Sequence, residues 1–408
     1  MNYQDSLDWL YSTQTFGIKL GLENISRLLD ELGVTADRKG RKIIHVAGTN
    51  GKGSVCAFSE RILRDAGLRS GLFTSPHLMT YRERVRVSGE LIPAEAVAEL
   101  LTRIRGLVID WEHHPTFFEI SLGLAMRWFC DQDCEAIVLE TGMGGRLDAT
   151  NALLSDVCVI TSISLDHEQW LGDTIRQVAT EKAGILKRNV PVIIAELHPE
   201  AREVIGRRTL TLGIPCIEVH PLPPEWDLGL QGPHQRENAA LAVEAVCRIE
   251  GDRLTRDGIR QSLAATSWPG RFQCIGDGLI LDGAHNPDAA ERLRQTWEAA
   301  FPGEKARLIF GAVKTKDVAG IFRALLPVID SVTFVPVKSE RRLSVAEMRA
   351  AFLESGGAGI PTDESSDLIA AVEASRRRDG KTLVAGSLFL VGEALGHFLG
   401  ERFEVSLQ

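Results

Sequence analysis

Residues 48–54, GTNGKGS, have the composition of a loop that binds a polyphosphate. An apolar run, residues 42–47, precedes the loop, and apolar residues recur at helical spacing over residues 55–65. Between a strand and a helix, backbone N–H groups and the helix N-terminus face the phosphate, and a lysine adds a mobile positive charge. Glycines let the backbone approach the phosphate oxygens closely. The candidate ATP-binding residues are therefore Gly48, Thr49, Asn50, Gly51, Lys52, Gly53 and Ser54.

The loop departs from the strict Walker pattern at two places. Val46 stands where the first glycine of that pattern would lie, and Gly53 separates Lys52 from the hydroxyl of Ser54. A glycine-rich turn with a chance lysine would have the same composition, so that alternative stays open. The strand before the loop and the helix after it favour the phosphate loop.

Two apolar runs end in polar side chains that suit a divalent cation. Residues 136–139 lead into Glu140, and residues 157–160 lead to Asp166 and His167. In parallel α/β sheets, ligands collect at the carboxyl ends of strands. Mg²⁺ prefers a few protein ligands and several waters. The alternatives are an exposed glutamate before a turn, and a helix-capping aspartate followed by an unrelated histidine.

A sheet must position these residues, and the sequence predicts one. Residues 1–40 have a largely helical pattern, after which apolar runs alternate with helical patterns. The alternation is typical of right-handed crossovers, so we predict an α/β fold with a mostly parallel sheet covered on both faces. The predicted strands are residues 43–46, 71–74, 136–140, 157–162, 192–195 and 216–219.

A chain of 408 residues is long enough for two or three domains. Proline and glycine mark loops at residues 221–224 and 267–271. A second series of strands is then predicted at residues 279–282, 306–310, 332–336 and 382–385. We predict a P-loop ATP-binding domain over residues 1–271, a linker over residues 272–276, and a smaller Rossmann-like α/β domain over residues 277–408.

The composition argues against several classes of protein. The content of 44% hydrophobic and 25% charged residues is ordinary for a soluble globular protein. A net charge of −9 argues against nucleic-acid binding. No apolar stretch reaches the ~18–20 residues of a membrane span, and the N-terminus lacks the features of a signal peptide. We expect a cytoplasmic monomer whose partners are small molecules, with no nucleic-acid or membrane partner.

The sequence of the loop resembles that of the folate branch of the Mur-ligase-like family, in which a glycine follows the lysine. This branch comprises the folylpolyglutamate and dihydrofolate synthases. Further segments resemble this family in the same order along nearly the whole chain. They are TSPHL at 74–78, TFFE at 116–119, ETGMGGRLDATN at 140–151, EKAGI at 181–185, GPHQREN at 232–238, DGAHNP at 282–287 and GSL at 386–388. The resemblance implies a Mur-ligase-like architecture.

The resemblance also implies roles for individual residues. Lys52 and Arg271 would bind the β- and γ-phosphates, and Asn238, Asp282 and His285 would meet the nucleotide. The implied Mg²⁺ ligands are Ser54, Ser75, Glu140, His167 and Lys182, the last of them carbamylated by CO₂. The candidate catalytic residues are Lys52, Lys182, His167 and Arg271. Without the resemblance, residues 181–185 read as an ordinary surface segment.

Four residues match the family's pterin and folate site: Arg82, Thr116, Phe118 and Asp148. For Phe118, a buried aromatic at the start of a helix is the alternative. The sequence departs from the family at residues 314–317, where relatives usually carry D-K-D, and at residues 340–343, where they carry P-R-A. The segment between residues 219 and 231 is also short. These departures concern the edge of the substrate site.

The implied activity is the ATP-dependent ligation of L-glutamate to dihydropteroate and to the γ-carboxylate of folates, through an acyl phosphate. A folylpolyglutamate synthase without the first activity is the close alternative. Gly53 and the TSPHL segment disfavour a Mur-type peptidoglycan ligase. A nucleotide-gated binding module would be a different class, and it would turn over ATP independently of glutamate and of any pterin.

Overall fold

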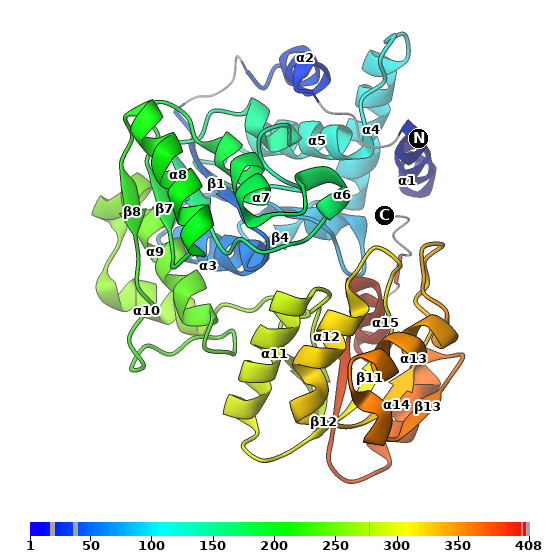
Figure 1. The fold of residues 1–408 in the computed structure, drawn as a ribbon. Coiled ribbons are helices and arrows are strands. Elements are labelled where there is room, and N and C mark those ends of the chain that lie inside the picture. The colour runs from blue at the N-terminus through cyan, green and yellow to red at the C-terminus, as the bar shows by residue number, and fades with distance from the viewer. Residues whose placement is uncertain (17–20, 36–39, 277, 401–402, 405–408) are drawn as a thin grey trace.

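The computed structural model describes residues 1–16, 21–35, 40–276, 278–400 and 403–404. They form two sheets with helices on both faces of each, one above the other in Figure 1. We call the residues up to 271 the N-terminal part and those from 272 the C-terminal part. The predicted α/β fold with a mostly parallel sheet is confirmed.

The sheet of the N-terminal part has eight strands in the order β4-β3-β2-β5-β1-β6-β7-β8. The parallel strands are β1 (Lys42–Ala47), β2 (Ser70–Phe73), β5 (Ala136–Glu140), β6 (Val157–Ile160), β7 (Val192–Ile194) and β8 (Cys216–Glu218). Two antiparallel strands, β3 (Val85–Val87) and β4 (Glu90–Leu91), complete one edge. Because β1 lies between β5 and β6, the carboxyl ends of these three strands lie side by side.

Successive residues of β1 face opposite helical layers, as expected for a strand buried on both sides. Ile44 and Val46 pack in the core beneath α3 (Lys52–Asp65), α9 (Gln235–Glu250) and α10 (Arg256–Ala264). Ile43 and Ala47 face the other layer. That layer holds α1 (Tyr3–Ser12), α2 (Glu23–Glu31), α4 (Ala94–Val108), α5 (Phe117–Asp131), α7 (Ile175–Lys182) and α8 (Pro199–Leu212).

The sheet of the C-terminal part has six strands in the order β13-β12-β11-β14-β10-β9. They are β9 (Gln273–Ile275), β10 (Leu279–Leu281), β11 (Ala306–Phe310), β12 (Ile329–Phe334), β13 (Thr362–Glu364) and β14 (Lys381–Ala385). One face carries α11 (Pro287–Ala300), α12 (Val318–Leu325) and α13 (Val345–Glu354). The other carries α14 (Leu368–Arg376) and α15 (Leu388–Leu399).

The C-terminal sheet begins inside the segment that the sequence assigns to a linker. Residues 273–275 form β9, which pairs antiparallel with β10, and Phe272 is buried in the C-terminal core. Each apolar run predicted as a strand overlaps one. The strands that the sequence does not predict are β3, β4, β9 and β13, which hold two or three residues each. Strands this short, with partly exposed polar residues, leave no apolar run in the sequence.

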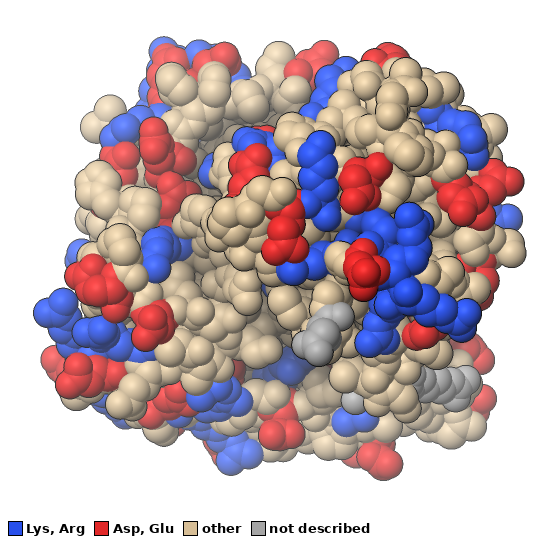
Figure 2. Space-filling view, turned by 90° about the horizontal axis from the view of Figure 1, so that it is seen from below, with Lys and Arg blue, Asp and Glu red and all other residues tan. Residues whose placement is uncertain are grey.

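The surface of the C-terminal side carries charges of both signs. Figure 2 shows Lys and Arg side chains gathered right of the centre around an acidic side chain, with both signs mixed among uncharged residues elsewhere. None of the helices within the described ranges is both long enough and apolar enough to cross a membrane.

The segment after Glu140 and the segment that carries Lys182 approach each other closely at the carboxyl edge of the N-terminal sheet. The Arg146 N–H donates to the Glu181 carbonyl at 2.8 Å, and Asn151 Nδ2 donates to the Gly184 carbonyl at 3.1 Å. A methyl group on Gly184 would collide with the backbone of Arg146. The glycine therefore sets the distance between the segment that carries Lys182 and the segment after Glu140.

We predict that Gly184→Ala destabilises the protein by about 1–3 kcal/mol, because the two backbones must move apart. Thermal and chemical unfolding would measure this change. Gly206→Ala is the matched control, since a methyl group there meets nothing within 4 Å in α8. Alanine favours a helix over glycine by about 0.5–1 kcal/mol, so the control should be slightly stabilised. Equal effects of the two changes would contradict the close approach.

Candidate active site

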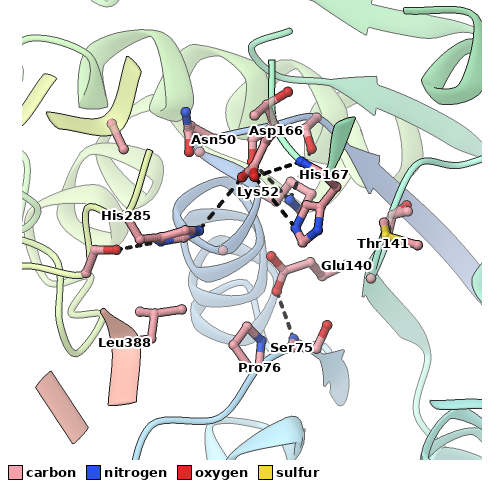
Figure 3. A pocket seen from close by; sticks show the side chains of 18 of the residues that line it. Asn50, Lys52, Ser75, Pro76, Glu140, Thr141, Asp166, His167, His285 and Leu388 are labelled. Atoms are coloured by element: carbon pink, nitrogen blue, oxygen red, sulfur yellow. Dashed lines mark hydrogen bonds and ion pairs between the residues drawn. The ribbon is translucent and has the colours of Figure 1, made fainter. Parts of the chain in front are cut away.

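One cavity of about 810 Å³ lies between the two parts of the molecule and collects residues from both. Every candidate site residue named from the sequence lines it, except Arg82. These residues are Gly48, Thr49, Asn50, Gly51, Lys52, Gly53, Ser54, Ser75, Thr116, Phe118, Glu140, Asp148, His167, Lys182, Asn238, Arg271, Asp282 and His285. Figure 3 shows the centre of the cavity, with Lys52, Glu140, Asp166, His167 and His285 arranged around one space.

The phosphate loop needs its glycines because neighbouring side chains approach its backbone. Gly51 has φ +88°, and a Cβ there would lie 2.5 Å from Asn238 Oδ1. A Cβ on Gly48 would collide with the hydroxyl of Thr161. The loop is tied to the segment after β6, since the Thr49 N–H donates to the Ser162 carbonyl at 2.7 Å. Helix α3 begins at Lys52, so the end of the loop forms its first turn.

Two lysines share one carbonyl of this loop. Lys52 Nζ donates to the Gly48 carbonyl at 3.0 Å, and Lys182 Nζ donates to the same oxygen at 2.8 Å. Lys182 is buried, and its burial together with the charge of Lys52 lowers its pKa to about 7. A large fraction of its side chains would therefore be neutral amines at neutral pH.

Glu140 ends β5 as a buried carboxylate beside the phosphate loop. Its Oε2 accepts the backbone N–H of Ser75 at 3.1 Å (Figure 3). Burial raises the pKa of Glu140, and the charges of Lys52 and Arg271 oppose that change. Within the described ranges, no Lys, Arg or His forms an ion pair with Glu140, and no three His, Cys, Asp or Glu side chains cluster as a metal site. Glu140 therefore offers a cation a buried carboxylate without a salt-bridge partner among the described side chains.

Asp166 joins the two parts of the molecule. Its Oδ1 accepts from Lys316 Nζ at 2.6 Å, and its Oδ2 accepts from Asn286 Nδ2 at 3.1 Å. His285 Nε2 lies 3.9 Å from the same Oδ2 (Figure 3). The side chains of Asp166 and Lys316 are each only 10% exposed. Burial alone would raise the pKa of Asp166, but the charge of Lys316 holds it well below its ordinary value. A buried ion pair therefore spans the cavity.

The phosphate loop itself also contacts the C-terminal part. Asn50 Nδ2 donates to Asn286 Oδ1 at 3.1 Å and to Asp288 Oδ2 at 2.8 Å. Asn286 Nδ2 donates in turn to Asn50 Oδ1 at 3.1 Å. Asn286 caps α11, so the start of this helix is held against the loop. The contact fixes the loop relative to Asp282 and His285.

Asp282 and His285 follow β10 and face the cavity from the C-terminal part. The carboxylate of Asp282 accepts the backbone N–H groups of Phe272 and Ala284, both at 2.8 Å. His285 Nδ1 lies 2.8 Å from the Gly283 carbonyl and must donate to it, because a carbonyl only accepts. Burial and the charge of Lys316 lower the pKa of His285 to about 4. The neutral ring then carries its lone pair on Nε2.

His167 has a left-handed backbone, with φ +53°, and starts the short helix α6 (Glu168–Leu171). The His167 side chain is half exposed; its partial burial and the positive charges of nearby lysines lower its pKa, and the charge of Asp166 opposes that change. The neutral imidazole that results is the form that binds metals.

The far end of the cavity holds the candidate pterin residues. Phe118 packs against Phe73, with ring centroids 5.6 Å apart. The edge of the Phe118 ring also lies close to Gly142, only 2.7 Å from the position that a Cβ would take there. The Thr116 hydroxyl donates to Glu119 Oε2 at 2.8 Å in the capping box of α5. The buried carboxylate of Asp148 lies beside Gly142, 3.1 Å from the same Cβ position.

Arg82 does not reach the cavity. Its Nε donates to the carbonyl of Ile92 at 2.6 Å, which holds the side chain against the antiparallel edge of the sheet. Its neighbour Arg84 does line the cavity and donates to His77 Nδ1 at 2.8 Å. Arg82 and Arg84 both belong to the 3₁₀ helix η2 (Tyr81–Arg84), and of the two only Arg84 lines the cavity, so a role of Arg82 at the folate site stays a prediction.

The sequence does not reveal the residues that join the two parts. Lys316 and Asp166 are 150 positions apart, and no motif or periodicity connects them. Asn286 lies within the quoted DGAHNP segment, but nothing marked it or Asp288 as a contact of the phosphate loop. The only signal was the departure of residues 314–317 from the D-K-D pattern of relatives.

Comparisons with known proteins agree with this geometry. The family model for the Mur ligase middle domain matches residues 46–209, and the model for the Mur ligase glutamate ligase domain matches residues 270–388. The chain is 30% identical to dihydrofolate synthase/folylpolyglutamate synthase of Bacillus subtilis, over 96% of this chain and 98% of that protein.

Two solved structures share the whole fold. Mycobacterium tuberculosis folylpolyglutamate synthase, complexed with ADP and AMPPCP, superposes with a TM-score of 0.89 at 29% identity, over 99% of this chain and 100% of that one. E. coli FolC in complex with DHPP and ADP gives a TM-score of 0.85 at 30% identity, over 97% of this chain and 98% of that one.

We predict that Asp166→Asn lowers the steady-state turnover of ATP and glutamate by about tenfold or more, because the buried charge of Lys316 loses its counter-charge and the two parts dock less well. Glu340→Gln is the control, since Glu340 is an exposed carboxylate on the loop beside the one that carries Lys316. Small-angle scattering would measure the opening of the cavity. Unchanged turnover and unchanged compactness in Asp166→Asn would contradict a role for the ion pair in closure.

Proposed function

The chain belongs to the Mur ligases, in the family of the dihydrofolate synthase/folylpolyglutamate synthases, and we propose how its cavity carries out the reaction. It is an ATP-dependent ligase that adds L-glutamate to folates. The prediction that it also acts on dihydropteroate agrees with the double name of its relative. The observation that carries the proposed mechanism is one cavity that unites the phosphate loop with Asp282 and His285 of the other part.

The reaction must activate a carboxylate. A carboxylate and an amine do not condense in water, so the γ-phosphoryl group of ATP is transferred to the carboxylate to form an acyl phosphate. Lys52, Arg271 and the N–H groups of the phosphate loop would neutralise the charge of the moving phosphoryl group. The glutamate amine then attacks the acyl carbon, and phosphate leaves.

Closure of the cavity supports this chemistry in two ways. Two substrates held in a reactive arrangement avoid an entropic barrier of up to ~7–11 kcal/mol. A closed cavity also excludes water, which would otherwise hydrolyse the acyl phosphate. The contacts of Asp166 with Lys316 and of Asn50 with Asn286 would hold the cavity closed around the substrates.

We infer that the same site holds Mg²⁺, and the residues present suit it. The buried Glu140 has no ion-pair partner among the described residues, and Ser75 is bonded to it through its backbone. The neutral His167 lines the same space. The residues that would hold the cation are Ser54, Ser75, Glu140, His167 and carbamylated Lys182. When bound, it would offset the negative charge of the phosphates.

The carbamate of Lys182 is supported by the state of its amine. A carbamate forms when a neutral amine adds CO₂ and loses a proton, and a pKa near 7 makes the neutral form available. The amine lies beside Lys52, where a positive charge is unfavourable and a negative one is favourable. Carbamylation would therefore relieve the repulsion between the two lysines.

The pterin would bind at the end of the cavity lined by Thr116, Phe118 and Asp148. Phe118 offers a ring face for stacking, and Asp148 offers a buried acceptor. Dihydropteroate ends in a benzoate-type carboxylate, whereas a folate presents a γ-carboxylate several bonds further out. One phosphoryl-transfer centre serves both only if the ring docks at different places.

A monomeric state and a cytoplasmic location remain predictions from the sequence.

We predict that Lys182→Ala lowers metal-dependent turnover by at least ~10²-fold, by analogy with the loss of one preorganised electrostatic group. Short carboxylic acids should restore part of it by replacing the carbamate. In ¹³C-bicarbonate, the wild type should show a carbamate carbon signal that Lys182→Ala lacks. Lys187→Met is the matched control, because Lys187 is a second largely buried lysine whose amine donates to Asn151 at 2.8 Å. A wild type without the signal at neutral pH would refute the carbamate.

We predict that Phe118→Ala raises the KM for dihydropteroate by about tenfold while use of a reduced folate monoglutamate changes much less, because only the first substrate loses its stacking surface. Ligation assays with ATP, glutamate and a panel of pteroates would measure both. Phe129→Leu, in the same helix but outside the cavity, controls for packing. Equal losses on both substrates would make Phe118 a packing residue. A wild type inactive on dihydropteroate would leave folylpolyglutamate synthesis alone.

A further inference from the structure

His45 is a buried polar residue whose function is not explained by the chemistry above. It lies in β1, two residues before the strand ends, and it is fully buried. Its Nε2 lies 2.8 Å from Thr150 Oγ1 and 3.0 Å from Thr141 Oγ1, while its Nδ1 has no hydrogen-bond partner. The ring therefore makes all of its polar contacts through one nitrogen.

The direction of these hydrogen bonds follows from Asp148. Its Oδ2 accepts the N–H of Met143 at 2.9 Å, and its Oδ1 accepts the N–H of Thr150 at 3.0 Å and the Thr150 hydroxyl at 2.5 Å. The single proton of the Thr150 hydroxyl thus points to the carboxylate. Its oxygen must accept from the other side, so His45 Nε2 carries the proton and donates it.

A neutral ring with the proton on Nε2 agrees with the surroundings. Burial lowers the pKa of His45 to about 3, so the ring holds one proton. The bare Nδ1 is then an acceptor left unpaired in the core, which destabilises the folded protein. A leucine would fill this space without that cost. The contribution of the histidine to this site is therefore its hydrogen bond, and not its packing.

The chain of hydrogen bonds ends at the cavity. Asp148 lines the cavity beside Phe118, and both approach Gly142 closely. The amino-pyrimidine edge of a pterin presents neighbouring N–H donors, which a carboxylate accepts in pairs only when its plane is fixed. A carboxylate that rotated freely would lose this match.

We propose that His45 is a positioning residue for the pterin: it orients the Thr150 hydroxyl, which together with the backbone N–H groups of Met143 and Thr150 fixes the plane of the Asp148 carboxylate next to Phe118. This inference rests on the proposed binding of dihydropteroate by Asp148. His45 also contacts the Thr141 hydroxyl, but the Thr141 N–H is held separately by the Val46 carbonyl at 2.9 Å, so the backbone that follows Glu140 keeps its own support. The effect of losing His45 should therefore fall on one substrate.

The test compares His45→Leu with the wild type in steady-state ligation. The KM for dihydropteroate should rise about tenfold, whereas the KM for ATP and the kcat with a reduced folate monoglutamate should stay within about twofold. His45→Gln should restore the low KM, because its amide nitrogen can take the place of Nε2 as donor. Ile43→Val, which removes one methyl group from the same face of β1, controls for packing and should leave all three constants unchanged.

A second route does not depend on the folding of His45→Leu. Thr150→Val removes the hydroxyl between His45 and Asp148 at nearly constant shape, and it should raise the dihydropteroate KM by a similar factor. In the double variant Thr150→Val with His45→Gln, this KM should be no higher than in Thr150→Val alone. Uniform losses on every substrate in both variants would overturn the proposal in favour of a structural role.

Asp148→Asn separates this inference from the proposed function. If it raises the dihydropteroate KM while His45→Leu and Thr150→Val do not, the positioning role of His45 is wrong and the pterin contact stands. If Asp148→Asn has no effect on this KM, or the wild type does not use dihydropteroate, the pterin contact fails, and the inference fails with it.

Discussion

The active site depends on a contact between two separately built sheets, the buried ion pair of Asp166 and Lys316. The N-terminal sheet delivers the phosphate loop, Glu140 and Asp166 at the carboxyl ends of adjacent parallel strands. The C-terminal sheet delivers Asp282 and Lys316. Neither sheet encloses the cavity alone, so the reacting groups come together only when the parts dock. An ion pair is suited to this task, because its geometry specifies one docked arrangement.

The cavity contains more buried ionisable groups than a stable core would. Glu140, Asp148 and Lys182 are each buried, and burial shifts the pKa of each toward the neutral form. A packed core would replace such groups with apolar side chains. Their presence makes sense where substrates of opposite charge complete the site. These buried groups therefore lower the stability of the folded protein without substrates, and substrate binding would offset that loss, as is common at functional sites.

The sequence predicts the N-terminal half of the site well because its signals are local. A buried strand, a glycine loop and a helix follow one another, and the strand order brings Glu140 next to the loop through fully apolar runs. The contacts between the N-terminal and C-terminal parts cannot be predicted from the sequence because they are not local. Lys316, for example, lies 150 positions from Asp166. Arg82 and Arg84 lie in one short 3₁₀ helix, and no pattern in the sequence marks which of the two side chains lines the cavity. β9 was missed because it is short and none of its residues is fully buried, so it leaves no apolar run in the sequence.

The carbonyl of Gly48 shows how the phosphate loop could respond to the state of Lys182. In this structure it accepts from both Lys52 and Lys182, so two potential cations compete for one acceptor. A neutral Lys182 would compete less strongly with Lys52 for this carbonyl. A carbamate on Lys182 would be negative, so it would attract Lys52 and would no longer bind the carbonyl as a cation. Lys52, which lines the cavity together with Glu140, would then have a negative neighbour in place of a competing amine. The modification would thus supply a metal ligand and also redirect the lysine that the phosphates need.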